Sequence, residues 1–237
     1  MREKIVGILG GMGPEATADL FSKIILETKA TKEEEHLRII IDNNPKMPSR
    51  QDAILKNGES PVPAMIQTSK NLKNAGADFI IIGANTAHYF YDDIKKEIDI
   101  PILHIIDEAI KDLLKNYPNI KKVGVMATNA AVSTGLYKKC CERFGIDVIE
   151  NKDKLQQQIH DSIFKFKYEG LTKNILNLAS NSIQELIDEG AEAVIMGCTE
   201  IPIILKDKEF KIPIIDPNEV IAKVAVAYAK NRYDFED

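Results

Sequence analysis

The sequence predicts an α/β fold in which two similar halves each carry a parallel sheet flanked by helices. Short apolar segments rich in β-branched residues alternate with longer segments of helical periodicity, as in βαβ units. Two apolar segments, 78–88 and 192–200, superpose so that Gly83 falls on Gly197 and Ala84 on Cys198. Ligands of α/β sheets bind outside the carboxyl ends of the strands. Two related strand ends therefore predict one active site, in a cleft between the two halves.

Strand-like and helix-like segments alternate along both halves. In the first half we predict strands over 4–9, 37–41, 78–83 and 100–104, helices over 14–25, 61–73, 86–96 and 107–115, and a loop over 46–52. In the second half we predict strands over 122–127, 146–149, 192–197 and 212–216, and helices over 134–144, 155–167, 171–188 and 218–230. Pro14 suits the first turn of its helix.

The repeat also predicts the domain boundaries. We expect a first α/β domain of residues 1–103 plus 212–237 and a second of residues 104–211, with the last strand and helix crossing back to the first half. The sequence contains no low-complexity linker between them.

Composition excludes several classes of protein. The net charge of −5 argues against a nucleic-acid partner, which favours a basic surface. The sequence has no apolar run of about 18 residues, so we expect no membrane span, and no apolar signal-peptide region follows Met1. The three cysteines form neither a disulfide framework nor a metal-ligand spacing. We therefore expect a cytoplasmic protein.

A glycine-rich segment follows the first strand. Gly11, Gly13 and Ala16 satisfy a loose dinucleotide fingerprint. Glu15, however, occupies the helix start where a pyrophosphate would lie, and no acidic residue closes a strand at the expected distance, because Asp42 comes too late. Two interpretations remain: a turn whose N–H groups face a small anion, and a turn that only permits close packing.

Cys198 follows a strand and precedes a predicted helix start at Thr199-Glu200. A helix N-terminus lowers a thiol pKa, and a thiolate can serve as base or nucleophile. The alternative is a small buried side chain, the common fate of a free cysteine. Cys140 and Cys141 lie mid-helix, where burial is the better explanation.

Polar residues follow the first strand end as well. Asn85 and Thr86 can donate to a carboxylate at a helix start, or Thr86 can merely cap the helix and His88 be a satisfied histidine. Arg50, in the predicted loop, suits bidentate binding of a carboxylate, although a lone loop arginine is more often solvated. The other histidines have no paired ligand spacing, so we predict no metal.

Three motifs carry a resemblance to a known family. They are Gly10-Gly11-Met12-Gly13-Pro14-Glu15-Ala16-Thr17, Asn85-Thr86-Ala87-His88 and Gly197-Cys198-Thr199-Glu200. Together they resemble the cofactor-independent aspartate/glutamate racemases, closest to the aspartate racemases, over the whole chain. The resemblance implies a racemase without pyridoxal phosphate or other cofactor, with a dicarboxylic amino acid held between two domains, and a homodimer.

The resemblance also implies residue roles. Two cysteines flank the substrate Cα, one removing a proton and the other returning one from the opposite face, and Cys198 is one of them. Asn85, Thr86 and Thr199 would bind the α-carboxylate. Arg50 and Lys167 would grip the side-chain carboxylate, and Met12 and Thr128 would complete the substrate contacts.

The sequence departs from the family pattern at the first cysteine. The residues in its place are Gly83 and Ala84, and neither has a proton to move. Three explanations follow: an introduced Cys→Ala change in an aspartate racemase, a single-cysteine relative similar to the arylmalonate decarboxylases, or a non-catalytic amino-acid-binding homologue. We expect an inactivated racemase, with Ala84 at the place of the missing cysteine.

Overall fold

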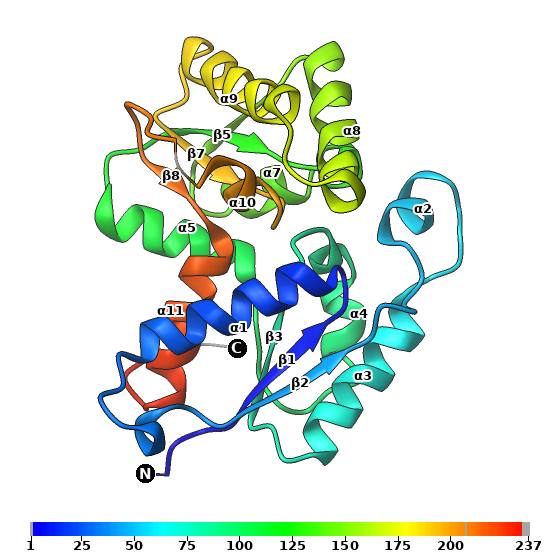
Figure 1. The fold of residues 1–237 in the computed structure, drawn as a ribbon, viewed down its shortest axis with the longest axis vertical. Helices are drawn as coiled ribbons and strands as arrows, with labels where there is room; N and C mark the ends of the chain where they lie inside the picture. Colours follow the sequence, from blue (N-terminus) through cyan, green and yellow to red (C-terminus); the bar gives the residue numbers. More distant parts are fainter. Residues whose placement is uncertain (1, 207, 234–237) are drawn as a thin grey trace. The chain divides into compact units, whose positions relative to one another are not determined.

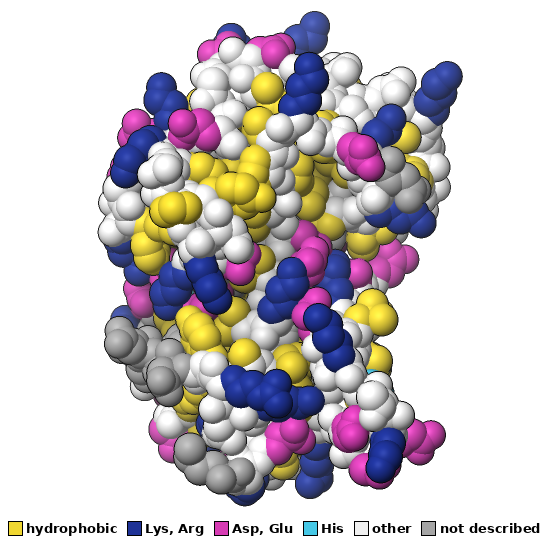
Figure 2. All heavy atoms as spheres, turned by 90° about the vertical axis from the view of Figure 1, so that its left-hand side faces the viewer, with side chains coloured by type: hydrophobic (Ala, Val, Ile, Leu, Met, Phe, Trp, Pro, Cys, Tyr) yellow, Lys and Arg dark blue, Asp and Glu magenta, His cyan; other side chains and the backbone are white. Residues whose placement is uncertain are grey.

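The computed structural model describes residues 2–206 and 208–233 (Figure 1). The chain divides into two compact units, Met1–Glu108 with Asn218–Asp237, and Ala109–Pro217. Helix α5 (Ile105–Asn116) runs across the first boundary between them. Within the described ranges, no helix is long and apolar enough to cross a membrane. Basic and acidic side chains are interspersed over the face drawn in Figure 2.

The first unit contains a four-stranded parallel sheet of order β2-β1-β3-β4. Its strands are β1 (Val6–Gly10), β2 (Ile39–Asn43), β3 (Phe79–Ile82) and β4 (Ile102–Leu103). Its helices are α1 (Pro14–Thr28), α2 (Arg50–Leu55), α3 (Val62–Asn74), α4 (Tyr91–Lys95) and α11 (Pro217–Ala229), with 3₁₀ turns η1 (Glu33–Glu35) and η2 (Thr86–Phe90). All residues of β1 and β3 are buried, as expected for strands covered on both faces.

The two faces of this sheet are covered by different helices (Figure 1). Leu9, Ile80 and Ile82 pack with α3 and α4 in one cluster. On the other face Phe79 meets Tyr228 of α11 edge to face, with 4.9 Å between ring centroids. The backbone N–H of Lys4 also donates to Ala229 O at 2.9 Å. These contacts explain why the last helix returns to the first unit.

The second unit repeats the topology, with sheet order β6-β5-β7-β8. Its strands are β5 (Lys122–Met126), β6 (Asp147–Glu150), β7 (Ala193–Met196) and β8 (Ile214–Ile215), and its helices are α6 (Asn129–Ser133), α7 (Leu136–Glu142), α8 (Asp153–Glu169), α9 (Lys173–Asp188) and α10 (Ile201–Leu205). Helices α8, α9 and α10 share an apolar cluster with Met126, Val194 and Met196. The α/β fold with two parallel sheets is therefore confirmed.

Several predicted boundaries were wrong. The expected loop over 46–52 ends early, because the Ser49 Oγ accepts from Asp52 N at 3.2 Å and caps α2, which starts at Arg50. The helix expected over 134–144 begins only at Leu136, because Gly135, whose φ of 61° is left-handed, separates α7 from α6. The helix expected over 86–96 is a 3₁₀ turn followed by the short α4. The segment expected to cross back from residue 212 begins later, because β8 pairs with β7 in the second sheet.

Candidate active site

Cys198 lies in the turn that links β7 to α10. The strand ends at Met196, and the backbone N–H of Gly197 donates to Met126 O at 2.8 Å, which extends the ladder by one residue. The Cys198 side chain is 7% exposed and packs among the residues of the α8–α10 cluster. Its thiol donates to Glu200 Oε2 at 3.0 Å.

Glu200 joins three of these groups. Its carboxylate accepts from the Thr199 hydroxyl at 3.1 Å and pairs with Lys167 Nζ at 3.0 Å, in addition to the Cys198 thiol. The residue is 5% exposed. The structure thus brings together Cys198, Thr199 and Lys167, three residues selected from the sequence, around a fourth that was not. An acidic residue within the apolar stretch from 193 to 205 is the signal that could have singled it out.

The protonation of Cys198 differs from expectation. Burial raises the pKa of the Cys198 thiol well above its ordinary value, and the negative charge of Glu200 raises it further, whereas Lys167 acts in the opposite direction. The sequence predicted a pKa lowered by a helix start. That prediction was wrong, because α10 is a short helix, and burial of the thiol, followed by the neighbouring carboxylate, outweighs any effect of its N-terminus. The thiol form is the resting form.

Ala84 occupies the corresponding turn of the first unit. The backbone N–H of Gly83 donates to Leu9 O at 3.2 Å, just as that of Gly197 donates to the last residue of β5. One residue further on, Ala84 in the first unit and Cys198 in the second stand at equivalent positions. Ala84 is 6% exposed.

His88 has its hydrogen bonds satisfied within the first unit. Its Nδ1 lies 3.0 Å from Ala84 O, a pure acceptor, and its Nε2 lies 3.2 Å from the Ile105 N–H, a pure donor. This pair of partners requires the neutral ring with the proton on Nδ1. Burial, followed by the nearby His104, lowers the His88 pKa to about 3. The interpretation of His88 as a satisfied core histidine is confirmed.

The other residues selected from the sequence lie as follows. Asn85 is buried and Thr86 half-buried, at the start of η2. Thr128 is buried at the N-terminus of α6. Arg50 is half-buried, and its Nη1 donates to Pro48 O at 3.0 Å from a helix that lies beside η2. Met12 belongs to the apolar cluster under α3. Their assignment as substrate contacts stays a prediction.

The glycine-rich turn after β1 is tightly packed. The Gly11 N–H donates to Thr17 Oγ1 at 3.0 Å, so it does not face an anion. Gly11 has a φ of +93°, and a Cβ there would lie 2.3 Å from the backbone of Asn44. A Cβ on Gly10 would lie 2.5 Å from the side chain of Thr17. Close packing against Thr17 of α1 explains Gly10, and close packing against the backbone after β2 explains Gly11.

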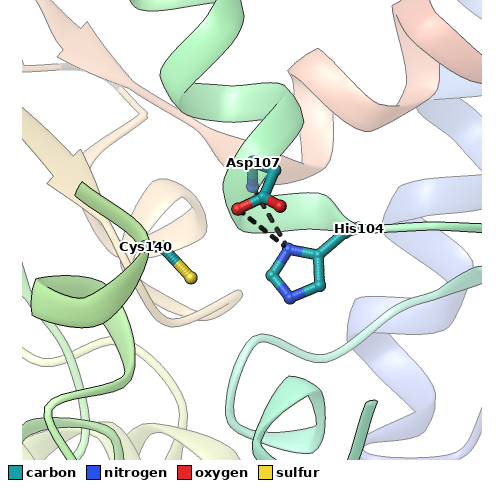
Figure 3. Close-up of side chains that lie close together, drawn as sticks. All are labelled: His104, Asp107 and Cys140. Carbon is teal, nitrogen blue, oxygen red and sulfur yellow. Dashed lines mark hydrogen bonds and ion pairs between the residues drawn. The ribbon is translucent and has the colours of Figure 1, made fainter. Parts of the chain in front are cut away.

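Two further sets of polar or thiol side chains are His104 with Asp107, and Cys140 with Cys141. At the start of α5, His104 Nδ1 accepts from the Asp107 N–H at 3.3 Å and lies 3.4 Å from the Asp107 carboxylate (Figure 3). Cys140 and Cys141 are buried cysteines on α7 that are not in disulfides, as the sequence indicated.

Comparison with known proteins relates this chain to amino-acid racemases. Residues 9–225 match the family model of Asp/Glu/hydantoin racemases. The chain is 30% identical over 227 residues to RacX of Bacillus subtilis, a broad-specificity amino-acid racemase, covering 94% of this chain and 97% of that protein.

The chain belongs to the Asp/Glu/hydantoin racemase family. Among solved structures, the aspartate racemase of Picrophilus torridus has a TM-score of 0.83 and 32% identity, covering 96% of this chain and 94% of that one. An aspartate racemase homologue of Pyrococcus horikoshii has a TM-score of 0.79 and 27% identity, covering 96% and 99% of the two chains. In this member of the family, Gly197-Cys198-Thr199-Glu200 follows β7 of the second sheet. Gly83-Ala84-Asn85-Thr86 follows β3, the equivalent strand of the first sheet.

Proposed function

We propose that this chain is a cofactor-independent aspartate racemase by descent that lacks one of its two acid/base groups. The observation that carries the proposal is the equivalence of Ala84 and Cys198, each one residue beyond a glycine that bonds to the neighbouring strand. In this arrangement the chain binds aspartate or a similar dicarboxylic amino acid and racemises it very poorly.

The chemistry requires a group on each face of the substrate. A single base can return a proton only to the face from which it came, so inversion at Cα needs a donor on the opposite face. Cys198 supplies one thiol. The methyl group of Ala84 can neither accept nor donate a proton, which removes the second.

The substrate class is supported by the polar groups near the two turns. Asn85 and Thr86 offer donors for an α-carboxylate. Thr199 can join them once its hydroxyl turns away from Glu200. Such donors also stabilise the charge of a carbanionic intermediate. The Arg50 guanidinium suits a second carboxylate, since its geometry allows two parallel hydrogen bonds. The similarity to an aspartate racemase of Picrophilus torridus agrees with a dicarboxylic substrate. We propose no metal or organic cofactor, because thiol acid/base groups alone can move the Cα proton.

A second candidate is one-sided chemistry by Cys198 alone, as in a decarboxylase that protonates a carbanion. The protonated thiol beside Glu200 favours it. A non-catalytic amino-acid-binding homologue is the remaining alternative. A homodimer and a cytoplasmic location complete the proposal, and light scattering tests the first of these.

Isotope exchange distinguishes these functions. L- or D-aspartate is incubated in D₂O with the original chain, with Ala84→Cys and with Gly83→Cys. The last is the matched control, because a Cβ on Gly83 makes only ordinary contacts, with Leu20 Cδ2 at 3.4 Å and Leu9 O at 4.0 Å. We expect racemisation with solvent deuterium at Cα for Ala84→Cys alone, whereas any exchange by Cys198 in the original chain proceeds with retention of configuration.

Failure of folded Ala84→Cys to exchange aspartate, glutamate or a neutral amino acid would overturn the proposal. Turnover of a substituted malonate by the original chain would favour the decarboxylase. Ligand binding that survives Cys198→Ala, with no turnover in any variant, would favour the binding protein.

A further inference from the structure

The carboxylate of Glu200 is the central group of a buried polar cluster in the second unit. It accepts from the Cys198 thiol and the Thr199 hydroxyl through Oε2, at 3.0 and 3.1 Å, and pairs with Lys167 through Oε1 at 3.0 Å. The side chain of Glu200 is 6% exposed, whereas that of Lys167 is 27% exposed. The cluster is therefore open to water mainly at its lysine end.

The fold brings these groups together from two elements. Cys198, Thr199 and Glu200 are consecutive in the β7–α10 turn, and Lys167 lies in the last turn of α8. The apolar side chains of Ile163 on α8 and Ile201 on α10 belong to one cluster, which fixes the two elements against each other. Glu200 is thus placed between the thiol and the ammonium group by packing.

A buried carboxylate is costly unless it is paired and hydrogen-bonded. Lys167 supplies the opposite charge, and the two donors satisfy a second oxygen. A carboxylate accepts hydrogen bonds and cannot donate one, so the shared hydrogen belongs to sulfur. Ionisation of Cys198 would replace this hydrogen bond with two negative charges about 3 Å apart, a repulsion that a buried setting strengthens.

We infer that Glu200 is a positioning residue that holds Cys198 as a thiol aimed for proton donation, with Lys167 balancing the charge of Glu200. The inference deepens the proposed function and rests on it for the identity of the reaction. In the donation step the Sγ–H bond breaks as a Cα–H bond forms on the carbanion, which leaves a thiolate. The thiolate regains its proton from water or from the Cα of the next substrate molecule.

Charged and titratable groups face Cys198 from its own turn and from the helices packed against it. They are Glu200 in its own turn and Lys167 on α8, while Tyr137 on α7 faces the same region, its pKa raised by burial and then by Cys140 and Cys198. Glu200 is the one among them that can accept the thiol hydrogen while carrying a negative charge. Replacing it with glutamine keeps the shape and an acceptor but removes the charge.

The direct test is a titration of the thiolate by its ultraviolet absorbance, with the spectrum of Cys198→Ser subtracted. We expect Glu200→Gln to raise the thiolate-to-thiol ratio of Cys198 at a given pH at least about tenfold, one pKa unit. Glu169→Gln, which changes an exposed carboxylate at the end of α8, should leave the ratio unchanged. An unchanged or lower ratio in Glu200→Gln would overturn the inference.

Lys167→Met provides a second arm should Glu200→Gln fail to fold. Removal of the cation should lower the thiolate-to-thiol ratio of Cys198, and a rise would contradict the charge balance proposed here. Neither titration needs catalytic activity, so both decide the inference even if the proposed racemase function fails.

The pH dependence of kcat/KM in the Ala84→Cys background separates a positioning role of Glu200 from a purely structural one. For the enantiomer that needs Cys198 as the proton donor, the alkaline limb of kcat/KM reports ionisation of the thiol. Glu200→Gln should shift that limb to lower pH. A uniform loss of activity without a shift would reduce Glu200 to a structural residue.

Discussion

The Cys198 thiol donates a hydrogen bond to the Glu200 carboxylate at 3.0 Å in a setting where both side chains are buried. The same carboxylate pairs with Lys167 on a helix that is distant in sequence. The thiol of Cys198, the carboxylate of Glu200 and the ammonium group of Lys167 therefore form one polar cluster among apolar side chains. The carboxylate accepts the thiol hydrogen of Cys198, and both burial and Glu200 raise the pKa of that thiol.

Loss of the Lys167 ammonium group should destabilise the folded protein. Lys167→Met leaves the Glu200 carboxylate buried without its cation, and we expect the free energy of unfolding to fall by about 2 kcal/mol, less than for a fully buried pair because Lys167 is partly exposed. Urea unfolding at neutral pH measures the change. Lys165→Met, on the exposed side of α8, is the control and should cost less than about 0.5 kcal/mol. Equal costs in the two variants would argue against a stabilising pair.

The two equivalent glycines should respond differently to substitution. A Cβ on Gly197 would lie 2.7 Å from Tyr137 Cε2, in a ring that is 1% exposed, so Gly197→Ala should cost about 1–3 kcal/mol. A Cβ on Gly83 would make an ordinary contact with Leu20 at 3.4 Å, and Gly83→Ala should stay within about 1 kcal/mol of the original chain. Thermal and urea unfolding of both variants provide the comparison. A larger loss in Gly83→Ala would contradict the packing around both turns.

Acid should destabilise the first unit through His88. The pKa of His88 is about 3 in the folded protein against an ordinary value of 6.5, so the unfolded chain binds the extra proton between these limits. The contribution of His88 to stability is therefore complete above pH 6.5 and is lost as pH falls toward 3, by about 1.4 kcal/mol per pH unit in mid-range.

Urea unfolding over a pH series measures this slope, and the difference from His88→Gln, which does not titrate, isolates the histidine. Nitrogen NMR of the His88 ring gives an independent check, since the proton should stay on Nδ1 throughout. A ring that gains a second proton near pH 6.5 in the folded protein would contradict its hydrogen-bond geometry.

Substitution of Arg50 tests the proposed dicarboxylic substrate. Arg50→Lys keeps the charge but loses the planar pair of donors, and we expect it to weaken aspartate binding roughly tenfold or more. Binding of a monocarboxylic amino acid such as alanine should change little, and calorimetry compares the two ligands. A parallel loss for both ligands would assign Arg50 to the structure of the Pro48 turn, to which its Nη1 donates.

The sequence by itself determined the fold class and the internal repeat. Alternation of apolar β-branched segments with helical periods is a local property, and it predicted both parallel sheets. The glycine that precedes Ala84 and the one that precedes Cys198 superpose in sequence, and each proves to extend a strand by one backbone hydrogen bond. Short helices were less predictable, because a single cap at Ser49 or a left-handed Gly135 decides where they begin and end.

Only the tertiary structure decided the chemistry of the thiol. The position of Cys198 before a helix predicted a lowered pKa, yet its burial and the Glu200 carboxylate raise it. The meeting of Lys167 with Glu200 depends on where the end of α8 lies against the turn after β7, which no local pattern encodes. The same holds for the ring of Tyr137 beside Gly197. Local periodicity determines which segments form strands and helices. Long-range packing determines which charged and polar side chains come into contact.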